Sequence, residues 1–359
     1  MTIIGLMSGT SMDGVDIVCC NYYKKAKNYS FQLLHCETLP YTEKLLEKLK
    51  NVLQLSVVDV LRLDKELGRF YAEAINTFCQ KYTIEKTNIS CIASHGHTVH
   101  HQPNLGFTQQ IGCGTTVAVL TGIKVVNDFR TKDVVLGGQG APLVPIGDKL
   151  LFANRAEAFL NLGGFSNITI VRKVRKETKI IAYDICVCNL ILNQLANKLG
   201  LNFDNNGAEA KKGQIHQELL QRLNDLPYYN DNPPKSLGAE FVNDIIFPIL
   251  NAYQISINDQ LCTFVEHISI QISNQFRQEN IRSVYVSGGG AKNTYLVNQL
   301  KKKNKNMVIE IPEREVIDYK EAIIFGLLGF LYLHDSPNSI ATVTGASREA
   351  VGGVLHKAI

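Results

Sequence analysis

The first residues able to do chemistry lie in a short polar stretch between two apolar runs. Glycine lets backbone N–H groups approach an anion closely, and hydroxyl groups donate to its oxygens. Two acids nearby would repel a bare phosphate, which favours a divalent cation between the acids and the phosphate. An ordinary β-hairpin turn uses the same residue types, so that interpretation stays open. The stretch contains Gly5, Ser8, Gly9, Thr10, Ser11, Met12, Asp13 and Gly14, followed by Val15 and Asp16.

Two later stretches repeat this character. Residues 159–171 read FLNLGGFSNITIV, in which Gly163 and Gly164 precede Ser166 and Asn167. Two such hairpins about half a chain apart predict two related lobes that face one ligand. Residues 286–293 read VSGGGAKN, and Gly288, Gly289, Gly290 and Asn293 stand there between an apolar strand and a helix. Such a turn suits a flat or phosphorylated ligand, although the chain has no Walker sequence.

Histidines crowd the end of a predicted strand at 90–94. His95, His97, His100 and His101 lie within seven residues. They suggest a metal site, but no carboxylate or cysteine is close in the sequence, and a strand-end loop that faces a polar ligand explains them equally well.

Charged residues follow two other predicted strands. Asp128 and Arg130 come after the strand IKVV, at the edge where open α/β sheets bind ligands, and they form either an active-site pair or a structural salt bridge. Asp184 ends the predicted strand KIIAYD and precedes the helix LILNQLANKLG. It acts either as a general base, with the helix N-terminus holding an anion or a developing negative charge, or as the cap of that helix.

Helical spacing of apolar residues predicts the elements that position these groups. It predicts two or three helices within 41–81, the second starting near Ser56, and a long helix over 259–280. A mostly apolar helix over 319–334 is expected to be buried, and the carboxylate of Glu321 near its start is either structural or directed at a ligand. Residues 204–240 are rich in loops and predict a mobile flap.

Length and composition bound the class of protein. A chain of 359 residues exceeds what one core usually supports, so two domains are expected. The net charge of +4 is small and its basic residues are scattered, which argues against a nucleic-acid partner. No apolar run is long enough for a membrane span and no signal peptide is evident. Nine cysteines without zinc spacing favour a reducing cytoplasm.

The chain as a whole resembles the anhydro-N-acetylmuramic acid kinases, within the actin, sugar-kinase and Hsp70 ATPase superfamily. The matching blocks are GLMSGTSMDGVD (5–16), SHGHTVHHQP (94–103), QIG (110–112), NDFRTKDVVLGGQGAPLVP (127–145), LNLGGFSN (160–167), PKS-G (234–238), SGGGAKN (287–293) and VTGAS (343–347).

The resemblance implies a fold and a division of the chain. The fold is a two-lobed α/β, actin-like ATPase (ribonuclease H-like) fold with its active site in the cleft between the lobes. Residues 1–140 would form the N-terminal lobe and 141–335 the C-terminal lobe, with 336–359 packing back on the N-terminal lobe. A homodimer and a role in cell-wall recycling are implied too.

The resemblance also implies an activity. An ATP-dependent kinase would open 1,6-anhydro-N-acetylmuramic acid by hydrolysis and phosphorylate O6, giving N-acetylmuramic acid 6-phosphate and ADP. Asp184 would be the catalytic base, and Asp13 and Asp16 would act on Mg²⁺ carried with ATP. ATP would bind at Gly9, Thr10, Ser11, Met12, Asp13, Gly14, Val15, Asp16, Gly163, Gly164, Ser166, Asn167, Gly288, Gly289, Gly290 and Asn293. The sugar would bind at His95, Thr98, Asp128, Arg130, Asn189 and Glu321.

The chain departs from the family pattern just after Asp184. Where the family has a Gly-Pro-Gly turn before the asparagine, this chain has Ile185-Cys186-Val187-Cys188 before Asn189. Bulkier residues restrict the backbone there, and the two cysteines are expected to pack rather than react. The departure leaves two alternatives open, a kinase of another amino sugar and a nucleotide-binding relative with impaired catalysis. An actin-like filament protein is a weaker third alternative.

Overall fold

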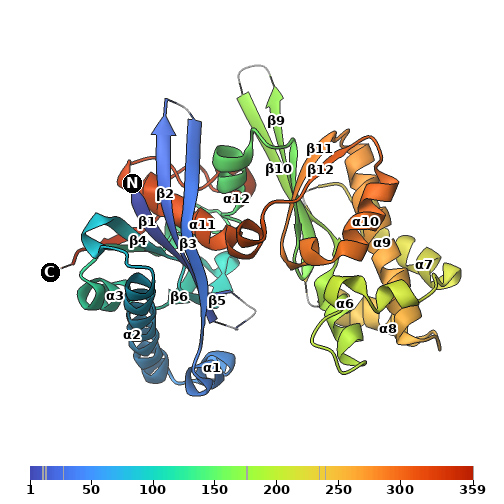
Figure 1. The fold of residues 1–359 in the computed structure, drawn as a ribbon, viewed down its shortest axis with the longest axis horizontal. Helices are drawn as coiled ribbons and strands as arrows, with labels where there is room; N and C mark the ends of the chain where they lie inside the picture. The colour runs from blue at the N-terminus through green and yellow to red at the C-terminus, as the bar shows by residue number, and fades with distance from the viewer. Residues whose placement is uncertain are drawn as a thin grey trace. The chain divides into compact units, whose positions relative to one another are not determined.

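The protein consists of two compact units that are discontinuous in sequence. The computed structural model describes residues 1–9, 12, 14–26, 28–174, 177–233, 235–238 and 240–358. The first unit comprises Met1–Leu151 and Tyr319–Ile359, and the second comprises Phe152–Asp318 (Figure 1). Residues 141–151 and 319–335, which were expected in the C-terminal lobe, therefore belong to the first unit.

The first unit is built on a sheet that has six strands among the described residues. Their order is β13-β7-β4-β1-β2-β3. The strands are β1 (Thr2–Met7), β2 (Gly14–Lys25), β3 (Asn28–Pro40), β4 (Ile89–Ser94), β7 (Val125–Asn127) and β13 (Val354–His356). A separate hairpin consists of β5 (His97–Gln102) and β6 (Phe107–Ile111). The helices are α1 (Glu43–Lys50), α2 (Val57–Lys81), α3 (Gly114–Thr121), α4 (Thr131–Val135), α5 (Pro145–Gly147), α11 (Arg314–Leu333, which begins in the second unit) and α12 (Ala341–Thr344).

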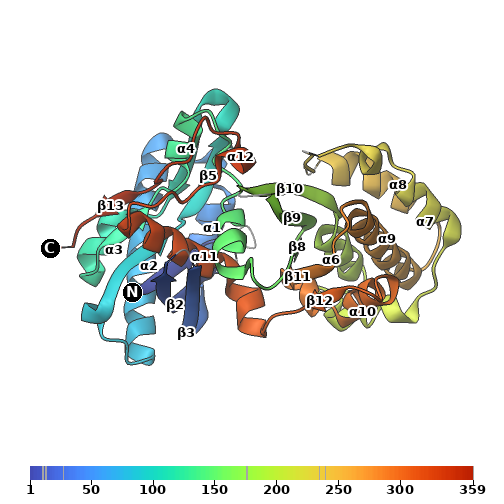
Figure 2. The same cartoon turned by 90° about the horizontal axis from the view of Figure 1, so that it is seen from above.

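The second unit is built on a sheet that has five strands in the described part of the chain. Their order is β10-β9-β8-β11-β12. The strands are β8 (Ala158–Leu162), β9 (Phe165–Val174), β10 (Glu177–Val187), β11 (Ser283–Ser287) and β12 (Val308–Glu310). Helices lie to one side of this sheet in Figure 2: α6 (Asn189–Asn197), α7 (Gln217–Asn224), α8 (Phe247–Asn251), α9 (Ile257–Gln278) and α10 (Thr294–Lys303).

The two sheets share one topology, as the two similar hairpins predicted. In each, three antiparallel strands (β1, β2 and β3, or β8, β9 and β10) are followed by two parallel strands that pair on the far side of the first (β4 and β7, or β11 and β12). This common order confirms the α/β class with two related lobes. The first unit adds β13, which pairs antiparallel with β7 and brings the C-terminal segment onto this sheet.

Helix α11 packs directly across the first sheet. A Cβ atom at Gly5 of β1 would collide with the Ala322 carbonyl, so the helix backbone approaches the strand at a residue that has no side chain. The Tyr22 hydroxyl donates to the Ile323 carbonyl oxygen at 2.5 Å. Gly329 similarly faces Ala93 of β4. This packing explains why the first unit includes residues 319–335.

Local sequence signals set several helix starts. Ser56 caps α2 by accepting the Asp59 N–H at 3.2 Å, and Ser256 caps α9 in the same way at 3.0 Å. A serine oxygen in this position satisfies one of the free N–H groups of the first turn. The predicted start of α2 near Ser56 is confirmed. None of the described helices is long and apolar enough to cross a membrane.

Candidate active site

A row of polar side chains crosses three neighbouring strands of the second sheet. Asn161 on β8 pairs with Asn167 on β9, and Asn167 pairs with Asp184 on β10. Directly paired residues point to the same face of a sheet, so these three half-buried side chains form one polar strip. Asn161 was not among the residues singled out from the sequence. The signal that could have found it is a polar residue inside the apolar run FLNLGG.

Asp184 is held by several contacts of its backbone and carboxylate. Its Oδ2 accepts the Leu237 N–H at 2.9 Å, and its N–H donates to the Lys235 carbonyl at 3.1 Å. The Tyr228 hydroxyl donates to the Asp184 carbonyl oxygen at 2.7 Å. Burial raises the pKa of Asp184, while the Leu237 N–H opposes that rise. A carboxyl with a raised pKa is suited to general-base catalysis.

Strand β10 does not end at Asp184, which corrects the sequence prediction. It continues through the buried residues Ile185, Cys186 and Val187, with an irregular register between Asp184 and Cys186. The fully buried Ser166 hydroxyl accepts the Cys186 N–H and donates to the Cys186 carbonyl. Ser166, expected at ATP, therefore supports the strand beside Asp184.

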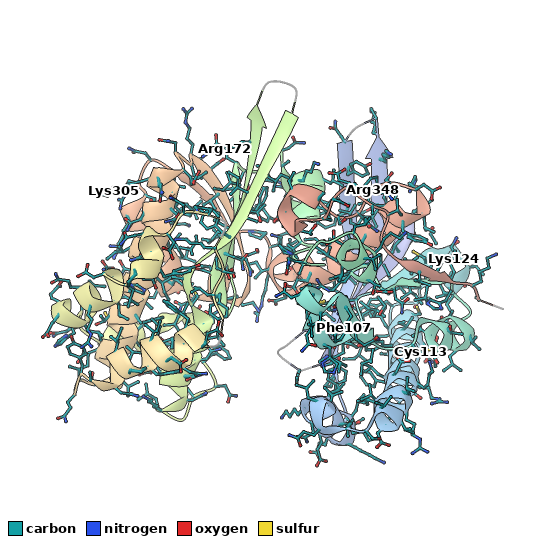
Figure 3. The ribbon with its side chains drawn as sticks, turned by 180° about the vertical axis from the view of Figure 1, so that it is seen from behind. Phe107, Cys113, Lys124, Arg172, Lys305 and Arg348 are labelled. Carbon is teal, nitrogen blue, oxygen red and sulfur yellow. The ribbon has the colours of Figure 1, made fainter. Side chains whose placement is uncertain are left out.

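The cysteines after Asp184 are packing residues, as predicted. Cys186 and Cys188 are fully buried in the core of the second unit. Burial raises the pKa of Cys186 to about 12, which disfavours the reactive thiolate. All nine cysteines are free, and among them Cys36 and Cys113 are the two that are not buried; Figure 3 labels Cys113.

The start of α6 is already occupied by the Gly163-Gly164 turn. The N–H groups of Cys188 and Leu190 donate to the Gly164 carbonyl, and that of Asn189 donates to the Gly163 carbonyl. The expectation that this helix start holds an anion is therefore wrong, because these donors have protein partners. Asp184 does not cap the helix either, since the N-cap residue is Cys188.

Asn189 connects the two glycine turns of the second unit. Its amide nitrogen donates to the Leu162 carbonyl at 2.8 Å. Cβ atoms added to Gly289 and Gly290 would lie 3.8 Å from Nδ2 and 3.1 Å from Oδ1 of Asn189, respectively. Asn189, expected at the sugar, thus lies where both turns meet. Asn293, expected at ATP, caps α10 by accepting the Leu296 N–H at 3.0 Å.

Replacing the adjacent glycines 288 and 289 by alanine should affect the stability of the protein very differently. Gly288 has a φ of +81°, and its Cβ would lie 2.5 Å from Asn161 Oδ1, so Gly288→Ala should destabilise the protein by about 1–3 kcal/mol. Gly289 is exposed, and a Cβ there would make only an ordinary van der Waals contact with Asn189, so Gly289→Ala should change stability by less than about 0.5 kcal/mol. If ATP approaches this backbone, Gly289→Ala weakens ATP binding about tenfold in calorimetry, equal to ~1.4 kcal/mol. Wild-type affinity in a folded Gly289→Ala variant would contradict that placement.

In the first unit, part of the predicted phosphate turn is described. Thr10, Ser11 and Asp13 lie outside the described residues. Of the other expected ATP contacts, the Met12 N–H donates to the Gly9 carbonyl, while Gly14 and Val15 are buried in the sheet. Asp16 Oδ1 accepts the Thr38 hydroxyl at 2.6 Å. Asp16 and Thr38 are directly paired on β2 and β3.

Two of the expected substrate-side residues of the first unit, Arg130 and His95, are in direct contact. His95 Nε2 lies 3.1 Å from Arg130 Nε and 2.9 Å from Nη2, and Arg130 Nη1 donates to the Gly140 carbonyl at 2.8 Å. Burial and the adjacent guanidinium lower the pKa of His95 to about 3, so the ring is neutral and accepts from Arg130. Burial lowers the pKa of Arg130, and the negative charge of the Glu321 carboxylate opposes that shift.

Asp128 is not the partner of Arg130. The Asp128 carboxylate accepts the Thr131 N–H at 3.3 Å, and no ion pair joins it to Arg130 in the described structure. The alternative of a structural Asp128–Arg130 salt bridge is therefore wrong.

Thr98, another expected substrate-side residue, is half-buried. Its hydroxyl oxygen accepts a hydrogen bond from the Gln110 side-chain amide at 3.3 Å.

The histidines near residue 95 have separate partners. His97 Nδ1 lies 2.9 Å from the Ser8 hydroxyl, and His101 Nδ1 lies 3.1 Å from that of Thr108. Within the described residues, no group of three histidine, cysteine or acidic side chains could hold a metal ion. These rings therefore act as hydrogen-bonding groups in the described structure.

Comparison with known proteins identifies the family. The chain matches the anhydro-N-acetylmuramic acid kinase family over residues 1–358. The chain belongs to this family. A relative of that name from Mannheimia succiniciproducens is 35% identical, with 98% of each chain covered. Another from Haemophilus influenzae is 34% identical, covering 99% of this chain and 97% of the relative.

Solved structures give more distant matches. The activator of the 2-hydroxyisocaproyl-CoA dehydratase from Clostridium difficile is 12% identical, with a TM-score of 0.47 over 92% of this chain and 94% of that one. A ROK hexokinase from Thermus thermophilus is 11% identical, with a TM-score of 0.40 over 92% of this chain and all of that one. These values are low, and the topology of the two sheets defines the fold without them.

Proposed function

We propose that this chain is an ATP-dependent kinase that opens 1,6-anhydro-N-acetylmuramic acid and phosphorylates its O6. The observation that carries the proposal is the position of Asp184, a half-buried carboxylate with a raised pKa in the same unit as two glycine turns. Membership of the family over residues 1–358 supports the choice of sugar. The products are N-acetylmuramic acid 6-phosphate and ADP.

The proposed reaction couples hydrolysis to phosphoryl transfer. Asp184 takes a proton from a water molecule, whose oxygen forms a bond to the anomeric carbon C1 as the bond between C1 and the bridging O6 breaks. The freed O6 then bonds to the γ-phosphorus of ATP, and ADP leaves. In such transfers a protein mainly positions the groups and balances charge.

In the second unit, the proposal assigns ATP to the turns at Gly163-Gly164 and Gly288–Gly290. Asn167 and Asn161 lie beside Asp184 in the polar strip and supply amide groups for phosphate oxygens. Ser166 and Asn293 are not assigned to ATP directly, because their side chains form hydrogen bonds with the backbone of β10 and α10, respectively. They stabilise the structure around the ATP site. Asn189 holds the two turns at one place.

In the first unit, the proposal assigns the sugar to Arg130, His95, Thr98 and Glu321, and the phosphates to the turn at 9–16. Asp16 fits a magnesium ion that arrives with ATP, since Mg²⁺ prefers oxygen ligands and is usually held by one or two carboxylates together with phosphates and water. Asp13 would be the second carboxylate. The ion supplies neutralisation of phosphate charge. The cytoplasmic location and the absence of a nucleic-acid partner stay predictions from the sequence, and the homodimer stays an expectation from the resemblance.

An ADP-release assay tests the proposal. We expect turnover with Mg-ATP and 1,6-anhydro-N-acetylmuramic acid, and none with N-acetylglucosamine or N-acetylmuramic acid. Turnover on one of the latter sugars alone would favour a kinase of another amino sugar. ATP binding without turnover on any of the three sugars would contradict the proposal and favour a relative that has lost catalysis.

A further inference from the structure

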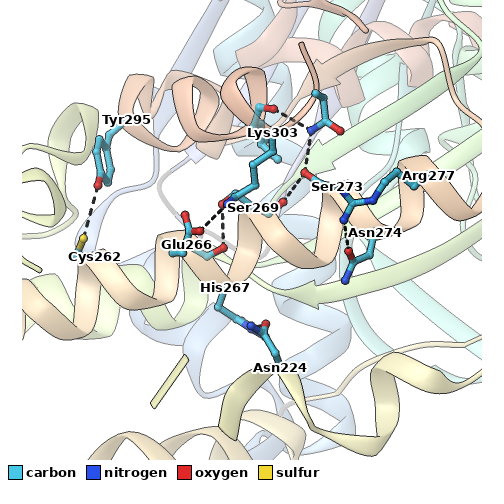
Figure 4. Close-up of polar contacts among 12 residues, drawn as sticks. Asn224, Cys262, Glu266, His267, Ser269, Ser273, Asn274, Arg277, Tyr295 and Lys303 are labelled. Carbon is cyan, nitrogen blue, oxygen red and sulfur yellow. Dashed lines mark hydrogen bonds and ion pairs between the residues drawn. The ribbon is translucent and has the colours of Figure 1, made fainter. Parts of the chain in front are cut away.

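Helix α9 carries an unusual set of buried polar side chains. His267 and Gln271 lie one turn apart on this helix, His267 is fully buried, and Gln271 is nearly so. Burying a polar group is costly unless it is hydrogen-bonded, so each requires a partner. Figure 4 shows His267 of α9 beside Asn224, the last residue of α7.

The hydrogen bonds around His267 define its tautomer. The Asn224 side-chain oxygen accepts from Gln271 Nε2 at 2.8 Å and lies 2.7 Å from His267 Nδ1. An amide oxygen can only accept, so Nδ1 carries the proton. The other ring nitrogen, Nε2, then accepts from the Tyr229 hydroxyl at 2.9 Å. Burial lowers the pKa of His267 to about 3, so the ring stays neutral at physiological pH.

The residue next to Tyr229 contacts the proposed base. Tyr228 and Tyr229 belong to one short 3₁₀ turn, Pro227–Asn230. The Tyr228 hydroxyl donates to the Asp184 carbonyl, and the Lys235 Nζ donates to the Tyr228 carbonyl at 3.1 Å while lying 4.7 Å from the centre of its ring. Lys235 and Leu237 in turn hold the backbone and carboxylate of Asp184. A continuous set of contacts therefore runs from α9 to Asp184.

We propose that His267 is a positioning residue for Asp184. Through the Tyr229 hydroxyl it fixes the 227–230 turn, so that Tyr228, Lys235 and Leu237 keep the carboxylate in one orientation. The inference rests on the proposed function only in that Asp184 is the base. A purely structural role would stabilise α9 and α7 without affecting the protonation of Asp184.

Tyr229→Phe tests the proposal with the smallest change to the structure, because it removes one hydroxyl and leaves the hydrogen bond between His267 and Asn224 in place. We expect kcat to fall about ten- to a hundredfold with KM for ATP unchanged. The Leu237 N–H lowers the pKa of Asp184, so loosening this bond should raise that pKa further. The acidic limb of the pH–kcat/KM profile should then move to higher pH.

Matched variants separate positioning from general stability. His267→Gln can still accept from Tyr229 and donate to Asn224, so it should keep much of the activity, whereas His267→Phe should not. Glu266→Gln is the control on the same helix, where Glu266 pairs with Lys303 at 2.5 Å (Figure 4). It should leave the pH profile unchanged.

Two measurements do not depend on turnover. Hydrogen exchange at the Leu237 amide should speed up in Tyr229→Phe, and a carbon-13 titration of the Asp184 carboxyl should give a higher pKa than in the wild type. If the wild type lacks sugar-kinase activity while both shifts occur, the proposed function fails and the positioning role stands. Unchanged exchange and an unchanged Asp184 titration in a folded Tyr229→Phe protein would overturn the inference.

Discussion

Replacing Asp184 by asparagine is expected to lower the rate of product formation by about 10²–10⁴-fold, the usual contribution of a general base. The asparagine side-chain oxygen can still accept the Leu237 N–H, so the local structure should persist and ATP should bind with near wild-type affinity. Single-turnover measurement of N-acetylmuramic acid 6-phosphate, beside calorimetry with ATP, checks both halves of this prediction.

The role of Asp184 as a base also predicts how the activity depends on pH. Only the deprotonated carboxylate can take a proton, and burial raises the pKa of Asp184 above that of an exposed aspartate. Activity in the wild type should therefore fall, as the pH is lowered, at a higher pH than 3.8, the ordinary aspartate value. Asp184→Asn should remove this acidic limb from any residual rate. Asp225→Asn, an exposed position in the same unit, is the control, and normal turnover by Asp184→Asn would exclude the base role.

Replacing Lys320 by methionine is expected to produce the largest loss of stability. Lys320 and Asp148 form an ion pair of 2.7 Å with side-chain exposures of only 7% and 3%. Removing one partner leaves a buried charge without its counter-charge, which costs about 3–5 kcal/mol. Urea unfolding followed by circular dichroism should show this loss in the first unit.

The double variant and a surface control test that explanation. Asp148→Leu combined with Lys320→Met removes both charges, so it should be less destabilised than either single variant. Lys81→Met breaks the Lys81–Glu37 pair, which is also 2.7 Å long but has 53% and 26% exposure, and it should cost less than about 1 kcal/mol. Additive losses in the Asp148/Lys320 double variant would show that the two charges do not stabilise each other.

Features written in short stretches of sequence were predicted well. The Ser56 side chain fixes the start of α2 by binding the N–H group of a residue three positions away. The similar hairpins at 5–18 and 159–171 correctly indicated two sheets with the same topology. The prediction that β10 ends at Asp184 was wrong. It relied on the position of this acidic residue shortly before a predicted helix, where a strand often ends. The apolar residues after Asp184 instead extend the strand, and the distant Ser166 hydroxyl binds its backbone there.

Contacts between residues that lie far apart in the chain could not be predicted from the sequence. Arg130 lies near Asp128 in the chain, yet its side chain binds His95. The set of contacts from His267 through Tyr229 to the turn beside Asp184 joins three segments that no spacing rule relates. Asn161 becomes notable only because the sheet register aligns it with Asn167 and Asp184.

The discontinuous first unit has a consequence for how the chain folds as it is synthesised. Gly5 and Tyr22 face α11, but residues 319–333, which hold most of that helix, are made only after the whole second unit. The second unit is one continuous stretch, Phe152–Asp318, and domains tend to fold as soon as they are complete. The second unit can therefore fold while β1 and β2 still lack the helix that will cover one face of their sheet.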